Sequence, residues 1–213
     1  MQFLYRPQVK TIFSAILILK WKKYLYFFAE YKQVSIGVHV LAVVLGMGSA
    51  LFSDALFNRF IADFKIDRFE HRLFSVLSKI IWVSLFVILA SGLAIFMSDI
   101  VSYSSSDKFL AKVTVVLLII LNGFFFKICI DPSLRKINFS DTNGQHRYVK
   151  LRRLSFAFGA VSVISWLFAC ALALYKGSHF SYSTIMLVYA SLVLVGILCS
   201  QILERMIVKR ANQ

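Results

Sequence analysis

The chain has 213 residues, 59% of them hydrophobic and 16% charged, and a mean hydropathy of +0.76, which excludes a soluble globular protein. Lys and Arg number 24 against 10 Asp and Glu, giving a formal net charge of +14. No polar stretch is long enough for a nucleic-acid-binding domain, so we assign this charge to loops that face the cytoplasm and its anionic lipid headgroups, and expect no nucleic-acid partner.

We expect an all-α protein, namely a polytopic transmembrane helix bundle of five spans preceded by an N-terminal interfacial helix. Residues 1–33 mix short apolar runs with lysines and aromatic rings, a pattern typical of a helix that lies at headgroup depth. Residues 34–203 hold the spans, and residues 204–213 form a short basic tail. The alternative is that the N-terminal segment crosses the bilayer as a sixth span, which would place three lysines near mid-membrane.

Four windows without Lys, Arg, Asp or Glu are long enough to cross the hydrocarbon core, which takes about 20 residues. They are residues 34–53, 80–98, 154–175 and 180–203. The third helix in chain order carries Lys112 and Lys127, with fourteen uncharged residues between them. It spans the membrane if both lysine stems extend outward to the headgroups.

The connections between the spans are polar. Helical spacing of apolar residues continues into residues 54–73, so the first two helices should extend beyond the membrane into a basic hairpin. Residues 102–107 predict a turn in which Ser106 or Asp107 caps the third helix, and residues 133–153 predict a basic loop.

The distribution of positive charge predicts the orientation. With five spans, the hairpin, the basic loop and the tail share one face and carry thirteen Lys and Arg, whereas the other connections carry only Lys108 and Lys176. Because positive loops stay inside, we expect a multi-pass protein of the inner (plasma) membrane with a cytoplasmic C-terminus. The six basic residues of residues 1–33 then lie outside, which is the one conflict with this topology.

Residue types that commonly carry chemistry are scattered. The three cysteines, Cys129, Cys170 and Cys199, form no C-x-x-C pair, so neither a disulfide framework nor a zinc site is indicated. The sequence contains no acid pair, no nucleophile with a nearby base and no Gly-rich phosphate loop. It therefore gives no positive sign of an enzyme.

Small residues recur at helical spacing within the spans, where they allow helix backbones to approach one another. They are Ala42, Gly46 and Ala50 on the first span, Ser84 and Ser91 on the second, and Gly196 on the fifth. Spacings of four and seven residues favour helix packing, with the sevenfold spacing typical of left-handed bundles. Whether the protein forms a homo-oligomer is left open.

His39 is the one histidine inside a span, and it lies within about 20° of Gly46 around the helix, on the face that packs inward. An inward ionisable residue indicates a metal or haem ligand, a proton relay or a hydrogen-bond partner. Lys112 and Asn122 lie nearest in depth, so we take all three as candidate cofactor-binding residues and His39 as the candidate metal ligand. The plain alternative is a neutral imidazole bonded to a serine or carbonyl on a neighbouring helix.

The order of features carries a resemblance. An early inward His39 is followed by a basic hairpin, then Ser91-Gly92-Leu93, then Phe109-Leu110-Ala111-Lys112. This order resembles the bacterial inner-membrane group that includes copper-resistance D-type domains and HemJ-type protoporphyrinogen oxidases, over residues 34–175. The resemblance implies haem or metal at His39 and a helix-opening lysine at Lys112. Where that group leads us to expect a later histidine the chain reads Leu121-Asn122-Gly123, so the resemblance does not extend to bis-histidine ligation or oxidase activity.

Three functions remain open at this stage. The bundle can bind haem, a metal or a quinone through His39; it can be a small transporter or channel subunit; or it can be a non-catalytic membrane assembly partner. Transporters usually show broken helices at the substrate site, whereas the only prolines, Pro7 and Pro132, lie outside the spans. The cofactor itself is not identified by the sequence.

Overall fold

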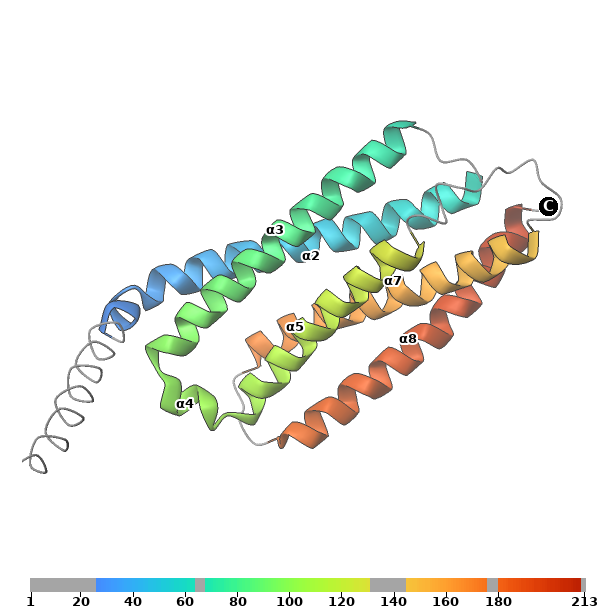
Figure 1. The fold of residues 1–213 in the computed structure, drawn as a ribbon. Helices are drawn as coiled ribbons and strands as arrows, with labels where there is room; N and C mark the ends of the chain where they lie inside the picture. Colours follow the sequence, from blue (N-terminus) through green and yellow to red (C-terminus); the bar gives the residue numbers. More distant parts are fainter. Residues whose placement is uncertain (1–25, 64–67, 131–144, 176–179, 212–213) are drawn as a thin grey trace, which may run out of the picture.

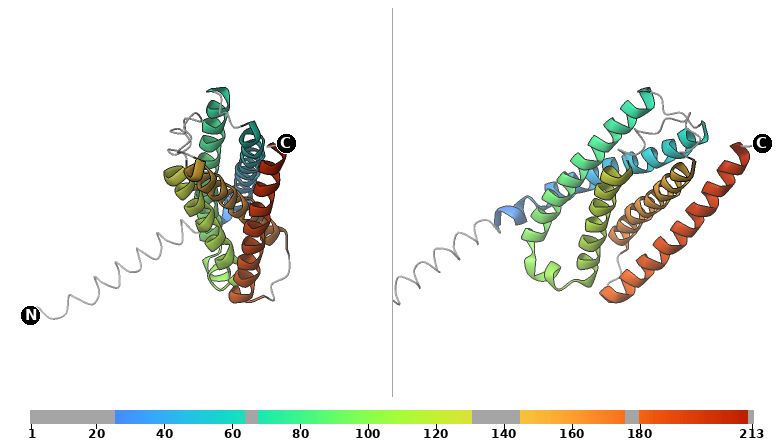
Figure 2. Two further views of the ribbon diagram at one scale, coloured as in Figure 1. Left: turned by 90° about the vertical axis from the view of Figure 1, so that its right-hand side faces the viewer. Right: turned by 45° about the vertical axis from the view of Figure 1, so that its right-hand side comes forward.

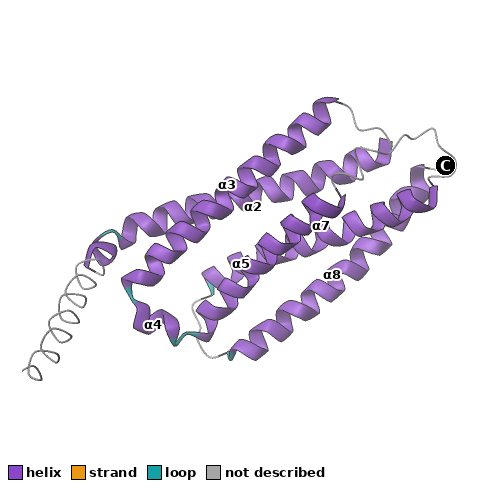
Figure 3. Cartoon of the chain, viewed as in Figure 1, coloured by secondary structure: helices purple, strands orange, loops and turns teal. Residues whose placement is uncertain are grey.

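The computed structural model describes residues 26–63, 68–130, 145–175 and 180–211. Every regular element in these ranges is a helix (Figures 1 and 3). In chain order they are α2 (Lys32–Asp63), α3 (Arg68–Ser98), α4 (Ile100–Ser104), α5 (Asp107–Phe125), the π-helix η1 (Phe126–Ile130), α7 (Gln145–Leu174) and α8 (Tyr182–Ala211). Within this described part, five helices are long and apolar enough to cross a membrane, which confirms the all-α multi-pass fold.

The helices are longer than the apolar windows that revealed them. α7 begins at Gln145, inside the segment predicted as a loop, and α8 continues to Ala211 through most of the predicted tail. Both extensions contain Lys and Arg but neither Gly nor Pro, and Lys and Arg are good helix formers. Loss of hydropathy therefore marked the predicted edge of the membrane and not the end of the helix. The predicted turn at residues 102–107 likewise overlaps the short helix α4.

Side-chain caps fix the helix ends around α4 and α5. Asp99 accepts a hydrogen bond from the Ser102 N–H at 3.2 Å, and its interactions with Ser102 hold the pKa of the Asp99 carboxyl below its usual range. Of the two predicted caps of α5, it is Ser106 that accepts from the Phe109 N–H, at 3.3 Å. Most of the predicted interfacial segment, residues 1–25, lies outside the described residues.

α2 packs along α3, and α7 packs along both α5 and α8, while contacts of α2 with α7 join these two groups (Figure 1). Figure 2 shows α4 and the start of α8 at one end of the bundle, which we call the α4 end, and the end of α8 at the other, which we call the C-terminal end. At the α4 end, Asp107 accepts from the Tyr182 N–H at 3.2 Å and the Lys108 ammonium donates to the Tyr175 carbonyl. The start of α5 is thus tied to both ends of the α7–α8 connection.

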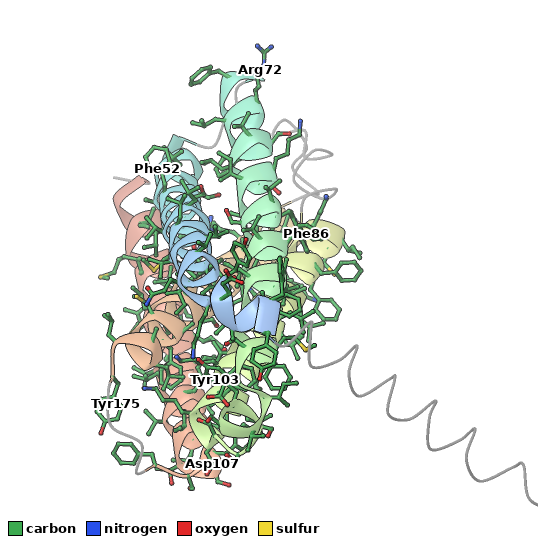
Figure 4. All side chains as sticks on the ribbon, turned by 90° about the vertical axis from the view of Figure 1, so that its left-hand side faces the viewer. Phe52, Arg72, Phe86, Tyr103, Asp107 and Tyr175 are labelled. Carbon is green, nitrogen blue, oxygen red and sulfur yellow. The ribbon has the colours of Figure 1, made fainter. Side chains whose placement is uncertain are left out.

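The core of the bundle is thin. It consists of Ala42, Ala50, Leu85, Ile88, Val115, Ile119, Trp166 and Tyr189. In each of the five spans only 17–22% of the most apolar window is buried, and large apolar side chains such as Phe52 and Phe86 are exposed (Figure 4). Such an outer surface suits lipid, which solvates apolar side chains.

Helices approach one another closely in the core at Gly46 on α2. A Cβ atom at this position would lie 2.8 Å from Cη2 of Trp166 on α7 and 3.0 Å from Cβ of Ser84 on α3. Gly46 therefore lets three helices meet, with the Trp166 ring filling the space that a side chain would take. Gly196 on α8 makes a similarly close approach to Ile164 on α7.

Gly46→Leu should destabilise the bundle by at least about 1–3 kcal/mol, because the new side chain has to displace Trp166 or Ser84. Val44→Leu is the matched control, since Val44 is 56% exposed on the same helix. Thermal unfolding of both variants in detergent measures the difference, with the Val44 variant expected to stay close to wild type. Equal melting temperatures would contradict this assignment of helix faces.

Candidate intramembrane polar site

His39 on α2 forms a side-chain hydrogen bond across the α2–α3 interface. Its Nδ1 lies 3.0 Å from Oγ of Ser91, and the Ser91 hydroxyl donates to the carbonyl of Val87 at 2.5 Å. Because the single hydroxyl proton is used in that bond, Ser91 Oγ accepts from Nδ1–H of His39. The ring also packs on Gly92, where a Cβ would lie 3.5 Å from Cε1 of His39. The Ser91-Gly92 pair therefore orients the imidazole.

This tautomer leaves Nε2 as the nitrogen with a free lone pair. Among the described residues, the side-chain hydrogen bond of the ring runs from Nδ1 to Ser91 Oγ. The interhelical bond by itself explains how a polar ring is accommodated here. The chemistry still open to His39 is to donate the Nε2 lone pair to a metal centre or to accept a hydrogen bond.

Of the two residues predicted to accompany His39, only Lys112 lies within electrostatic range of it. The Lys112 ammonium lies near enough for its charge to act on the His39 ring, and Lys108, one turn earlier on α5, acts in turn on Lys112. Asn122 lies elsewhere: its Nδ2 donates to the carbonyl of Phe158 at 3.1 Å and so links α5 to α7. The polar site around His39 therefore comprises His39, Ser91 and Gly92, with Lys112 within electrostatic range.

The remaining histidines differ from His39 in position. His71 lies near the start of α3 and His146 near the start of α7, so both belong to helices and not to loops, just before the apolar windows of those helices. His179 lies outside the described residues. In the part of the chain that the structure describes, no three His, Cys, Asp or Glu side chains gather to hold a metal ion.

A carboxyl group that the sequence placed at the end of the first span lies instead between helices. Asp54 continues the four-residue repeat of Ala42, Gly46 and Ala50, because α2 runs on unbroken past it. Its Oδ1 would lie 3.4 Å from a Cβ at Gly159 on α7, and its Oδ2 is buried with no hydrogen-bond partner in the described structure. The four-residue register of α2 predicts this position, although a charged residue usually marks the end of an apolar span.

An ion pair is buried near the C-terminal end, between α7 and α8. Arg152 Nη2 and Nε both lie 2.5 Å from Oε1 of Glu204, and Glu204 is 1% exposed. Arg153 Nε lies 3.7 Å from Oε2 of Glu204, and Gln201 Nε2 donates to the Arg153 carbonyl at 3.0 Å. The sequence placed Arg152 in a loop and Glu204 in the tail, and both assignments were wrong because each helix extends past its apolar window.

Comparison of the chain with protein families, with curated proteins and with solved structures finds no match. The resemblance to the copper-resistance and HemJ-type group stays a prediction.

Glu204→Ala should cost about 3–5 kcal/mol of stability, because it leaves the Arg152 guanidinium buried without its carboxylate. Replacing both partners by apolar residues, as Arg152→Met with Glu204→Leu, should recover most of that loss. Arg153→Ala is the control, expected to cost less than about 1 kcal/mol since its pair with Glu204 is longer and its side chain half exposed. Unfolding in detergent measures all three; if the double variant is no more stable than Glu204→Ala, the ion pair does not act as described.

Proposed function

We propose that this multi-pass helix bundle binds a haem-type cofactor in the membrane, which His39 would hold through Nε2. The observation that carries the proposal is the 3.0 Å bond from His39 Nδ1 to Ser91. Histidines that ligate metals almost always donate their other ring N–H to a fixed acceptor, which sets the tautomer and the ring orientation. Ser91 supplies that acceptor within the apolar interior.

Lys112 complements this role. A haem carries propionate groups, and an ammonium near the liganding histidine can pair with one of them by a charge-assisted hydrogen bond. A bare metal ion is the weaker choice, because the described residues supply no cluster of three ligands. A quinone is the closest competitor, since Lys112 could donate to its carbonyl oxygen.

A second candidate function, proton or cation translocation, is favoured by Asp54. A carboxyl oxygen buried between two membrane helices without a partner is a position where a proton or cation can be held. His39 and Asp54 lie on the same helix, α2, so a path between the two would have to follow the interface of α2 with α3 and α7.

We further propose that the protein lies in the bacterial inner membrane with the C-terminal end of the bundle in the cytoplasm. Thirteen basic residues in the hairpin, the loop and the C-terminal segment support this orientation, against Lys108 and Lys176 on the other side. The polar site around His39 then lies in the periplasmic half of the bilayer.

The orientation predicts the behaviour of reporter fusions. A reporter active only in the periplasm should be silent when fused after Gln213 or inserted near Gly144, because both positions lie on the basic face. The same reporter inserted near Gly177 should be active. Activity at either of the first two positions would reverse the topology.

The cofactor proposal predicts an absorption spectrum. Protein purified in mild detergent and supplied with haem should show a Soret band that His39→Gln abolishes, because glutamine can still donate to Ser91 but offers no imidazole lone pair. His146→Gln should keep the band. Ser91→Ala should shift or weaken it, since the ring loses its fixed acceptor.

Two results would overturn the haem proposal. One is a band of equal strength in wild type and His39→Gln. The other is the absence of a Soret band in a wild-type protein that remains folded. In that case, a proton flux in vesicles that Asp54→Asn abolishes would favour translocation as the function.

A further inference from the structure

A groove of about 710 Å³ opens between α7 and α8 near the C-terminal end. Its lining residues are Val149, Lys150, Arg153, Leu154, Ala157 and Gln201. The most apolar part of α7 begins at Val149, so the groove lies where that helix enters the membrane. Its position is the level of lipid headgroups.

The charge around the groove is unbalanced. The groove has three basic residues at or beside it, Lys150, Arg152 and Arg153, and a single carboxylate, that of Glu204. The described parts of α7 and α8 contain no other acidic residue. Arg152 holds Glu204 at 2.5 Å, whereas Arg153 is 3.7 Å away and its side chain is 50% exposed. One carboxylate is therefore shared by Arg152 and Arg153, so Lys150 and the half-exposed Arg153 give the groove lining an excess of positive charge.

The groove is also amphipathic. Lys150 and Arg153 provide cationic donors, and Gln201 anchors the edge by donating to the Arg153 carbonyl at 3.0 Å. Leu154 and Ala157 continue the lining along α7 into the apolar span. A soluble anion would use only the cations, whereas a lipid uses both parts, with its phosphate at the basic rim and its acyl chains along the apolar wall.

We propose that this groove is a binding site for an anionic phospholipid, with the headgroup phosphate held by Lys150 and Arg153. Basic pockets between membrane helices at the cytoplasmic surface commonly bind anionic headgroups. The inference is independent of the cofactor proposal, because it involves the opposite end of the bundle and none of the residues around His39. It gives the buried ion pair a second role, which is to set the α7–α8 spacing that forms the groove.

Binding of dioleoyl-phosphatidylglycerol to the detergent-purified protein, counted by native mass spectrometry, tests the proposal. Dioleoyl-phosphatidylcholine is the neutral-lipid control, and soluble glycerol phosphate and inorganic phosphate are the headgroup controls. We expect tight binding of phosphatidylglycerol alone, weakened at least about tenfold by Lys150→Gln combined with Arg153→Gln. Arg72→Gln, which removes an exposed cation at the start of α3, should leave binding unchanged.

Each other outcome counts against the site. Equal binding of the two lipids, or equal losses in the double variant and in Arg72→Gln, would show that no specific headgroup site exists here. If inorganic phosphate competed with an affinity equal to that of the lipid, the groove would be a binding site for small anions. That result would overturn the lipid proposal. Lys150→Gln alone is the folding control for the double variant, because Lys150 is exposed. This single variant should keep the wild-type melting temperature while losing part of the affinity for phosphatidylglycerol.

Discussion

A polar group inside a bilayer has no water to bond, so it must find its partner within the protein. In this bundle those partners lie on neighbouring helices. His39 on α2 bonds to Ser91 on α3, and Asn122 on α5 bonds to the Phe158 carbonyl on α7. The hydroxyls of Ser165 on α7 and Tyr189 on α8 meet at 2.7 Å and link these two helices. Each of these hydrogen bonds lies at a different helix interface. Together they hold the helices in contact, because the apolar surfaces of these helices would pack equally well against lipid or against one another.

Close approach between helices makes these bonds possible. Gly46 lets α2 reach Trp166, and the same small-residue stripe carries the buried alanines Ala42 and Ala50. One turn further the stripe reaches Asp54, whose partnerless Oδ2 is the exception to the pairing rule. A polar atom that a fold leaves unpaired in a membrane is a natural place for a bound proton or cation. For this reason the translocation hypothesis stands beside the cofactor hypothesis.

The sequence was sufficient for the parts of the fold that depend on hydropathy and helical register. The five spans follow from uncharged apolar windows, and the 100° register of α2 put His39 on its inward face. It was insufficient for residues whose environment is set by another helix. Glu204 was read as part of a tail because nothing local indicates that Arg152, 52 positions earlier, is its buried partner. Asn122 was grouped with His39 by depth, yet its amide bonds a backbone carbonyl, an acceptor that no side-chain pattern reveals.

The tautomer of His39 decides which ring nitrogen is available for a ligand. The ¹⁵N chemical shifts of the imidazole, measured by solid-state NMR on histidine-labelled protein in lipid bilayers without added haem, report it directly, with His39→Gln used to assign the signals. We expect a protonated Nδ1 and an unprotonated Nε2, with Ser91→Ala shifting the Nδ1 signal. A ring protonated at Nε2 alone would contradict this expectation, since Nδ1 could not then donate to Ser91 and no lone pair would face a cofactor.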